Sequence, residues 1–356
     1  MQLLTETIAK IAPLDWAAME AARRRLDELT KPRGSLGLLE EIAVRLAGMA
    51  GEPMPAIGRK VVILMAADHG VAEEGVSAYP QEVTRQMLLN FARGGAGINV
   101  LARHVGAEVV VVDIGVRGRV AHPAILDRKV REGTANIANG PAMTREEAIA
   151  AIEVGIEIAR QTIGRNDSSG LALLATGEMG IGNTTAATAV LAAFSGFPVA
   201  RLVGPGTGLD EEGVRQKAKV IRRALEINRP DPRDGLEVLA KLGGLEIAGL
   251  VGCVLAAAAA RTPVLLDGFI SGAAALVAAR LAPQCLDYVF ASHLSAEPGH
   301  RVMLEMMGLR PLLALDLRLG EGTGAVLAMP IIEAATKIIK EMATFTEAGV
   351  SGPAMS

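Results

Sequence analysis

Short runs of apolar and β-branched residues, each ending at a polar or glycine-rich turn, recur from residue 60 onward and are separated by helical stretches. Buried parallel strands have near-continuous apolar sequences, because helices cover both faces of their sheet. Six such runs are predicted as strands: residues 61–66, 108–112, 171–175, 264–266, 288–291 and 312–315. The pattern predicts an α/β fold, doubly wound around a mainly parallel sheet with helices on both faces.

The two ends of the chain are predicted to be helical. Residues 15–29 have a charged helical face and are followed by Pro32, residues 38–49 are amphipathic, and a last helix is expected over residues 325–345. We expect these segments to form a smaller helical subdomain. The predicted division is N-terminal helices over residues 1–58, the α/β domain over 59–324 and the returning C-terminal helix over 325–356.

Composition narrows the classes of partner. The net charge of −3 offers no electrostatic field that would bind a polyanion, so nucleic acid is not expected.

Cys253 and Cys285 stand in apolar surroundings and are predicted to be core thiols of a protein in a reducing compartment. Residues 1–13 contain charges unlike a signal peptide, and the longest uncharged apolar run, residues 247–260, is shorter than the ~20 residues that span a bilayer. We expect a cytoplasmic protein without a membrane partner.

The run over residues 247–260 is predicted to be a buried helix. Its glycines and alanines allow close backbone approach, which suits either packing between helices or a subunit interface.

The stretch over residues 171–185 combines an apolar strand, a glycine-rich turn and an alanine-rich helix. Gly177, Gly180 and Gly182 are expected to let backbone amides approach an anion, and Asn183 and Thr184 fall at the helix N-terminus, which carries partial positive charge. The turn lacks the lysine of a triphosphate-binding P-loop and the spacing of a dinucleotide fingerprint. A monophosphate is the ligand that it suits, although such a turn also serves as a plain tight connection.

Two further glycine turns strengthen this interpretation. Residues 204–210 precede a helix bearing Lys217, and residues 267–272 directly follow a strand. In open α/β sheets ligands bind beyond the carboxyl ends of the strands, so the turns are expected to converge. Lys217 would add a point charge for phosphate, with a solvated helix face as the alternative.

Two glutamates stand in glycine-rich turns at strand ends. Glu321 lies between Gly320 and Gly322, and Glu178 lies in the first turn. An apolar surrounding would raise the pKa of a carboxyl group and make it a usable base near neutral pH. The alternative for each is a helix N-terminal acid that stabilises the helix dipole.

The sequence argues against several other chemistries. The five histidines and two cysteines form no His-x-x-x-His or Cys-x-x-Cys pattern, so no metal is expected and His69, His293 and His300 are interpreted as turn residues. No Gly-x-Ser-x-Gly occurs, which disfavours a serine hydrolase.

The same turns resemble the nicotinate-nucleotide:dimethylbenzimidazole phosphoribosyltransferase family over nearly the whole chain. The segments that carry the resemblance are residues 31–37 (KPRGSLG), 67–71 (ADHGV), 177–185 (GEMGIGNTT), 204–210 (GPGTGLD), 266–269 (LDGF), 292–300 (SHLSAEPGH) and 319–324 (LGEGTG). The resemblance implies a Rossmann-like catalytic domain, a homodimer and no metal or organic cofactor.

The resemblance also implies an activity. Members transfer phosphoribose from nicotinate mononucleotide to 5,6-dimethylbenzimidazole, giving α-ribazole 5′-phosphate and nicotinate with inversion at the anomeric carbon, in cobalamin lower-ligand synthesis. Glu321 matches the glutamate that takes the benzimidazole proton, and Glu178 matches the second active-site glutamate, interpreted as an orienting or electrostatic partner.

Substrate contacts follow from the turns and the resemblance together. The residues expected to hold phosphoribose are Gly180, Asn183, Thr184, Gly204, Gly206, Lys217, Asp267, Gly268 and Ser295. Those expected around the benzimidazole are Ser77, Tyr79, Met87, Met179 and Leu319. Met87 stands where some members align a glutamine, and Met179 and Leu319 flank the two glutamates, with core packing as the alternative for both.

Two rival functions remain open at this point. A nucleotide-dependent oxidoreductase would use the same kind of sheet but requires a dinucleotide fingerprint near the first strand, which the sequence lacks. A protein that binds α-ribazole or nucleotides without turnover is the non-enzymatic alternative.

Overall fold

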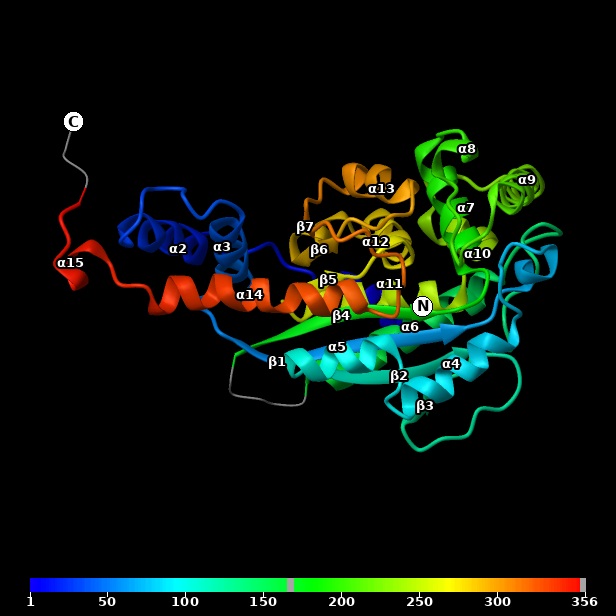
Figure 1. Ribbon diagram of the computed structural model, residues 1–356, viewed down its shortest axis with the longest axis horizontal. Helices are drawn as coiled ribbons and strands as arrows, with labels where there is room; N and C mark the ends of the chain where they lie inside the picture. The colour runs from blue at the N-terminus through cyan, green and yellow to red at the C-terminus, as the bar shows by residue number, and fades with distance from the viewer. Residues whose placement is uncertain (165–169, 353–356) are drawn as a thin grey trace.

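A seven-stranded, all-parallel sheet forms the centre of the computed structural model, which describes residues 1–164 and 170–352 (Figure 1). Its strand order is β3-β2-β1-β4-β5-β6-β7. The strands are β1 (Ile57–Ala67), β2 (Glu108–Gly115), β3 (Ile125–Asp127), β4 (Leu171–Met179), β5 (Val264–Leu266), β6 (Val289–His293) and β7 (Pro311–Leu313). The chain winds outward from β1 through β2 to β3, then returns to place β4 against the other side of β1. This reversal creates a topological switch point between β1 and β4.

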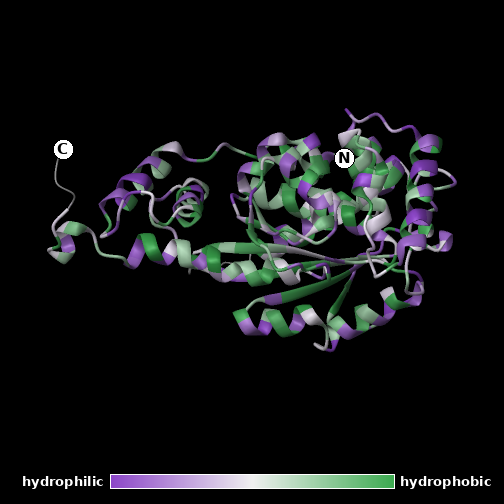
Figure 2. Cartoon of the chain, turned by 45° about the horizontal axis from the view of Figure 1, so that its top comes forward, coloured by the Kyte–Doolittle hydropathy of each residue, from purple (hydrophilic) through white to green (hydrophobic). Residues whose placement is uncertain are grey.

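Helices cover both faces of the sheet, which confirms the predicted doubly wound α/β fold. One face carries α6 (Arg145–Ile163), α11 (Leu245–Ala259) and α12 (Phe269–Leu281), and the other carries α4 (Glu82–Ala92), α5 (Gly97–Val105) and α14 (Thr323–Glu341). The central strands are largely hydrophobic (Figure 2), as their burial between two helical layers requires.

The remaining helices lie around these layers. Near the carboxyl ends of the strands are η1 (Gly70–Glu74), α7 (Asn183–Ser195), α8 (Val199–Leu202), α9 (Glu211–Asn228), α10 (Gly235–Leu242) and α13 (Gly299–Met307). The others are α1 (Gln2–Ile8), α2 (Trp16–Glu28), α3 (Leu38–Ala50), η2 (Pro283–Tyr288) and α15 (Phe345–Ala348).

The apolar helix α11 is enclosed within the chain. Its residues from Leu245 to Ala258 are all buried, and glycines bring it against α6: a Cβ added at Gly155 would lie 1.8 Å from the carbonyl oxygen of Gly249. The prediction of a buried helix is therefore confirmed, with packing between helices as its reason. The prediction that this helix is a candidate subunit interface is wrong, because the rest of the same chain covers it.

A small helical region lies at one end of the molecule, where α2 and α3 pack against the C-terminal part of α14 (Figure 1). An isolated antiparallel β-bridge between Leu29 and Thr344 joins the two ends of the chain there. The N-terminal part of α14 packs on the sheet, so this helix joins both regions. The division of the chain into residues 1–58, 59–324 and 325–356 stays a prediction.

The element boundaries differ from the predicted ones at informative places. Strand β4 continues through Met179, so Glu178 belongs to the strand and the turn begins after it. The three-residue strand β3 escaped prediction. The last long helix ends at Glu341, before residue 345, and Thr344 caps the short helix α15 with its side chain.

Candidate active site

A cleft of about 560 Å³ opens at the carboxyl ends of β4, β5 and β6 and beside the segment after β7. Its position beyond the strand ends of a parallel sheet is where α/β proteins bind small ligands. The residues that line it are Tyr79, Glu178, Met179, Gly180, Ile181, Asn183, Thr184, Gly206, Thr207, Asp267, Gly268, Phe269, Ile270, His293, Ser295, Glu297, Asp316, Leu317, Arg318, Leu319 and Gly320. The three predicted glycine turns and the glutamate turn therefore do converge.

Glu178 is the last residue but one of β4, and it is a buried residue of the cleft lining. Asn183, at the start of α7, donates a hydrogen bond to its Oε2. Burial, followed by the charges of Asp267 and Glu246, raises the pKa of Glu178 to about 8. Gly320 lies so close that an added Cβ would come within 2.3 Å of the Glu178 Oε1. The carboxyl group is consequently protonated for the most part at neutral pH in the unliganded protein.

Glu321 adopts a strained backbone conformation in the turn before α14. Its φ is 64°, in the left-handed region, which costs a non-glycine residue roughly 1–3 kcal/mol. Its side chain is 6% exposed, and its Oε2 accepts a hydrogen bond of 3.2 Å from the backbone N–H of Ile98 at the start of α5. Burial raises the pKa of Glu321. Glu321 itself does not line the cleft, whereas its chain neighbours Leu319 and Gly320 do.

The turn before α14 rests directly on β4. A Cβ added at Gly177 would lie 2.6 Å from the carbonyl oxygen of Glu321, so only glycine permits this contact. The prediction that Gly177 brings a backbone amide to an anion is wrong, because this glycine lies inside a buried strand. Its small size instead brings the two glutamate-bearing segments together.

Asp267, at the end of β5, supplies the hydrogen bonds that begin α14. Its Oδ2 accepts from the backbone N–H of Gly322 at 3.0 Å, and its Oδ1 accepts from Gly324 at 2.7 Å and from Ala325 at 3.1 Å. Burial raises the pKa of Asp267 to about 7, although these three N–H groups oppose the shift. Asp267 thus lines the cleft while both of its oxygens bind backbone.

Lys217 reaches from α9 to the N-terminus of α7. Its side chain is fully buried, and its Nζ donates to the Thr184 Oγ1 at 2.8 Å and to the Gly204 carbonyl at 3.2 Å. Burial lowers the pKa of Lys217 to about 8, while the nearby Glu297 carboxylate opposes the shift. The alternative of a solvated helix face is therefore wrong. Lys217 and Gly204 lie directly behind the cleft wall, whereas the other seven residues predicted to hold phosphoribose line the cleft.

Three of the five residues predicted around the benzimidazole line the cleft, and two do not. Tyr79, Met179 and Leu319 line the cleft, and Tyr79 and Leu319 are exposed at its mouth. Ser77 lies next to the lining residue Thr207, with 3.1 Å between their hydroxyl oxygens. Met87 on α4 does not line the cleft and packs against the hydrophobic core instead.

Three cleft residues escaped the sequence reasoning about chemistry. His293 ends β6, and burial lowers its pKa to about 4, so its imidazole is neutral at pH 7. One carboxylate oxygen of Glu297 accepts a 2.9 Å hydrogen bond from the Gly206 N–H. Arg318 donates at 3.0 Å to the Gly206 carbonyl and so joins two of the turns across the cleft. His293 and Glu297 lie in residues 292–300, a segment that carried part of the family resemblance, and only this resemblance could have indicated them.

His69 and His300 lie in the interior. Instead of occupying an open turn, His69 forms a fully buried contact of 2.6 Å with the Glu246 carboxylate beneath the first glycine turn. His300 is buried and accepts from the Ser295 N–H. Within residues 1–164 and 170–352, no group of three or more His, Cys, Asp or Glu is arranged to hold a metal ion.

Two general expectations concern the cysteines and the apolar helices. Cys253 and Cys285 are buried and unpaired, which confirms the prediction of core thiols. No helix among the described residues is both long enough and apolar enough to cross a membrane.

Glycine turns over a helix N-terminus, a buried lysine and buried carboxylates at the strand ends are typical of α/β enzymes that act on phosphorylated small molecules. A family model described as phosphoribosyltransferase matches residues 11–350. A relative from Chloroflexus aggregans, named nicotinate-nucleotide–dimethylbenzimidazole phosphoribosyltransferase, is 60% identical, covering 99% of each chain. A relative of the same name from Desulforamulus reducens is 58% identical, again covering 99% of each.

Solved structures agree with these comparisons. The crystal structure of CobT from Thermus thermophilus superposes with a TM-score of 0.90 at 55% identity, covering 94% of this chain and 99% of that one. The chain belongs to the nicotinate-nucleotide–dimethylbenzimidazole phosphoribosyltransferase family, as the sequence resemblance implied, and it is an enzyme of the phosphoribosyltransferase class.

Proposed function

We propose that this enzyme transfers phosphoribose from nicotinate mononucleotide to 5,6-dimethylbenzimidazole, giving α-ribazole 5′-phosphate and nicotinate in cobalamin nucleotide-loop assembly. The observation that carries the proposal is one cleft in which phosphate-type turns face an apolar wall with two buried glutamates beside it. The names of the full-length relatives support the choice of both substrates.

The phosphate of the donor belongs at the N-terminus of α7, beside Gly180 and Thr184, with the Lys217 ammonium behind Thr184. In this position backbone N–H groups, the helix dipole and a buried cation all act on one anion. The ribose then lies over Gly268 and Ser295, towards the ends of β5 and β6. Met179, Leu319 and Tyr79 supply the apolar surface for the flat acceptor base.

The transfer exchanges one carbon–nitrogen bond for another. The bond from C1′ to the pyridinium nitrogen breaks, and its electron pair leaves with nicotinate. An imidazole nitrogen of the acceptor then bonds to C1′ from the opposite face, which inverts the anomeric configuration. Glu321 takes the proton from the other imidazole nitrogen, so the product ring is left uncharged. Alignment of the two reactants contributes on the order of 7–11 kcal/mol to lowering the barrier.

The two glutamates have different tasks in this scheme. Glu321 is the general base. Its raised pKa makes its carboxylate a stronger base near neutral pH than an exposed glutamate. Glu178 is mostly protonated before the substrates bind, and it orients the acceptor. The positive charge of the bound nicotinate ring favours its ionisation. The mechanism assigns no task to a metal or organic cofactor.

The setting of the enzyme is part of the same proposal. We place it in the cytoplasm as a homodimer without nucleic-acid or membrane partners, and we divide the chain into an α/β catalytic domain over residues 59–324 and a helical subdomain from its two ends. The composition and the family resemblance support these assignments.

A product assay tests the function directly. The protein is incubated with nicotinate mononucleotide and dimethylbenzimidazole, and α-ribazole 5′-phosphate is measured by chromatography. Glu321→Gln keeps the shape of the side chain and removes its basicity, so turnover is expected to fall by ~10²–10⁴ while donor binding by calorimetry stays nearly constant. Binding of both substrates without product would support the non-enzymatic alternative. Near wild-type turnover of Glu321→Gln would remove Glu321 as the base.

A further inference from the structure

We infer that Asp267 is a positioning residue, which holds the turn of Glu321 in its strained conformation and thereby aims the base. The inference rests on the proposed role of Glu321. It reassigns Asp267, which the sequence suggested as a phosphoribose contact, to a role that acts through a neighbouring residue.

The helix that follows Glu321 lacks a side-chain cap of its own. Its N-cap position is Gly322, which has no side chain, so the first backbone N–H groups of α14 need another acceptor. The Asp267 carboxylate provides it from a different strand, with three hydrogen bonds of 2.7–3.1 Å to Gly322, Gly324 and Ala325. Each oxygen therefore accepts at least one backbone hydrogen bond from the turn or from the first residues of α14.

One of these hydrogen bonds acts directly beside the base. Gly322 follows Glu321 in the chain, and its N–H is held by the Asp267 Oδ2. The positive φ of Glu321 is unfavourable for a glutamate, so this conformation persists only where surrounding contacts enforce it. Gly177 packs against the Glu321 carbonyl, and Asp267 holds the next N–H group, so both restrict the backbone conformation of Glu321.

Asp267→Asn removes half of this acceptor capacity while changing the side-chain volume little. One amide oxygen remains for Gly324 and Ala325, but the amide NH₂ then faces the Gly322 N–H, and two donors repel each other. Because displacement of a reacting group by about 1 Å costs on the order of 100-fold, kcat is expected to fall by roughly 10–100-fold. The KM for nicotinate mononucleotide should hardly change, since the phosphate contacts stay in place.

A double variant separates positioning from substrate contact. If Asp267 acts through Glu321, then Glu321→Gln combined with Asp267→Asn should turn over no more slowly than Glu321→Gln alone. If Asp267 binds phosphoribose directly, the two losses should multiply and KM should rise, and that result would overturn the inference. The assignment of Glu321 as the base is tested separately, by the turnover of the Glu321→Gln variant alone.

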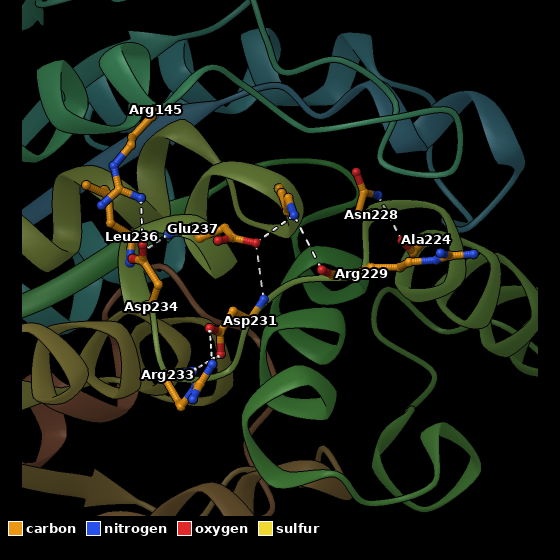
Figure 3. Close-up of polar contacts among 10 residues, drawn as sticks. Arg145, Ala224, Asn228, Arg229, Asp231, Arg233, Asp234, Leu236 and Glu237 are labelled. Carbon is orange, nitrogen blue, oxygen red and sulfur yellow. Dashed lines mark hydrogen bonds and ion pairs between the residues drawn. The ribbon is translucent and has the colours of Figure 1, made fainter.

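Asp234 offers a matched control at another helix N-terminus. It caps α10 by accepting at 3.0 Å from both Leu236 and Glu237, and it pairs with Arg145 in a surface network of which no member lines the cleft (Figure 3). Asp234→Asn keeps one oxygen for the two N–H groups but removes the negative charge at the helix N-terminus and the ion pair with Arg145, so it weakens this cap away from the cleft. Its kcat and KM are expected to equal those of the wild type, so an equal loss in both variants would show that general weakening of a helix cap suffices.

A measurement on the wild-type protein keeps the inference testable if Asp267→Asn does not fold. The titratable groups around Asp267 are Glu178 on β4, Glu321 in the turn and His293 on β6, and the pKa of Asp267 is raised to about 7. Protonation converts one accepting oxygen into a donor, so the hold on the turn weakens as the pH falls from 8 to 6.

Hydrogen exchange followed by mass spectrometry reads this change in the peptide over residues 320–326. After correction for intrinsic exchange rates, its protection should be lower at pH 6 than at pH 8. The peptide over residues 234–238 should show no such change, because the hydrogen bonds from Arg145 and the backbone outweigh burial and keep the pKa of Asp234 low. Equal protection of residues 320–326 at both pH values would overturn the inference.

Discussion

Glu178→Gln is expected to stabilise the fold while impairing the enzyme. The folded protein raises the pKa of this carboxyl group to about 8, above its ordinary value of 4.5, mainly by burial. Between these two pH values the unfolded chain is ionised at Glu178 whereas the folded chain keeps the proton. The unfolded state thus binds fewer protons, and this group lowers the stability of the wild type as the pH rises from 4.5 to 8.

The size of the effect follows from the same shift. Each pH unit in that interval corresponds to about 1.4 kcal/mol, so about 2.5 units up to pH 7 amount to a penalty of roughly 3–4 kcal/mol. Glutamine carries no charge to desolvate, and its amide oxygen still accepts the hydrogen bond that Asn183 donates. The stability gained by Glu178→Gln should accordingly be near zero at pH 4.5 and reach at most roughly 3–4 kcal/mol at pH 7.

Urea unfolding of the wild type and the variant at pH 5 and pH 7, followed by circular dichroism, measures this gain. Glu226→Gln, on the exposed face of α9, is the control and should change stability little at either pH. In the product assay, Glu178→Gln should lose acceptor binding and turnover together, because a group that orients the acceptor acts on both. A variant that is no more stable relative to wild type at pH 7 than at pH 5 would refute the burial argument.

Three further predictions concern binding and assembly. Lys217→Ala should weaken nicotinate mononucleotide binding by at least tenfold in calorimetry, since a hydrogen bond from a charged group is worth about 1.5–3 kcal/mol. Lys219→Ala, on the exposed face of the same helix, should leave this affinity unchanged. Equal affinities of the two variants would remove Lys217 from the site. Leu319→Ala should raise the KM for dimethylbenzimidazole more than that for the nucleotide, and the opposite order would place the acceptor elsewhere. Sedimentation at micromolar concentration should show a dimer, and a single species at the 37.0 kDa of one chain would contradict it.

The sheet could be predicted because its information is local. A buried parallel strand is a continuous apolar run, so residues 264–266 were predicted with their observed bounds. Strand β3 could not be found in this way, because two of its three residues are exposed and only Ile125 is buried. The length of β4 was underestimated for a related reason, since Thr176 and Gly177 resemble the start of a turn when read without their neighbours.

The candidate site could be predicted only in part, because its residues acquire their properties from distant segments. The glycine turns were recognised by composition, yet two of their glycines serve contacts between segments: Gly177 accommodates the Glu321 backbone and Gly320 accommodates the Glu178 carboxyl group. The alternative of dipole stabilisation also proved informative. A carboxylate does cap α14, but it is Asp267, which lies far from that helix in sequence.

The electrostatics of the cleft show why this arrangement suits an anionic donor. Glu178, Asp267 and Glu321 would place three negative charges beside the phosphate-type turns if each kept its ordinary pKa. Burial raises all three pKa values, and the mutual repulsion of the carboxylates adds to the shift of Glu178 and Asp267. Lys217, with a pKa of about 8, remains mostly charged at pH 7. The cleft therefore carries less negative charge than its sequence implies, and arrival of the positively charged nicotinate ring favours ionisation of the glutamates where a base is needed.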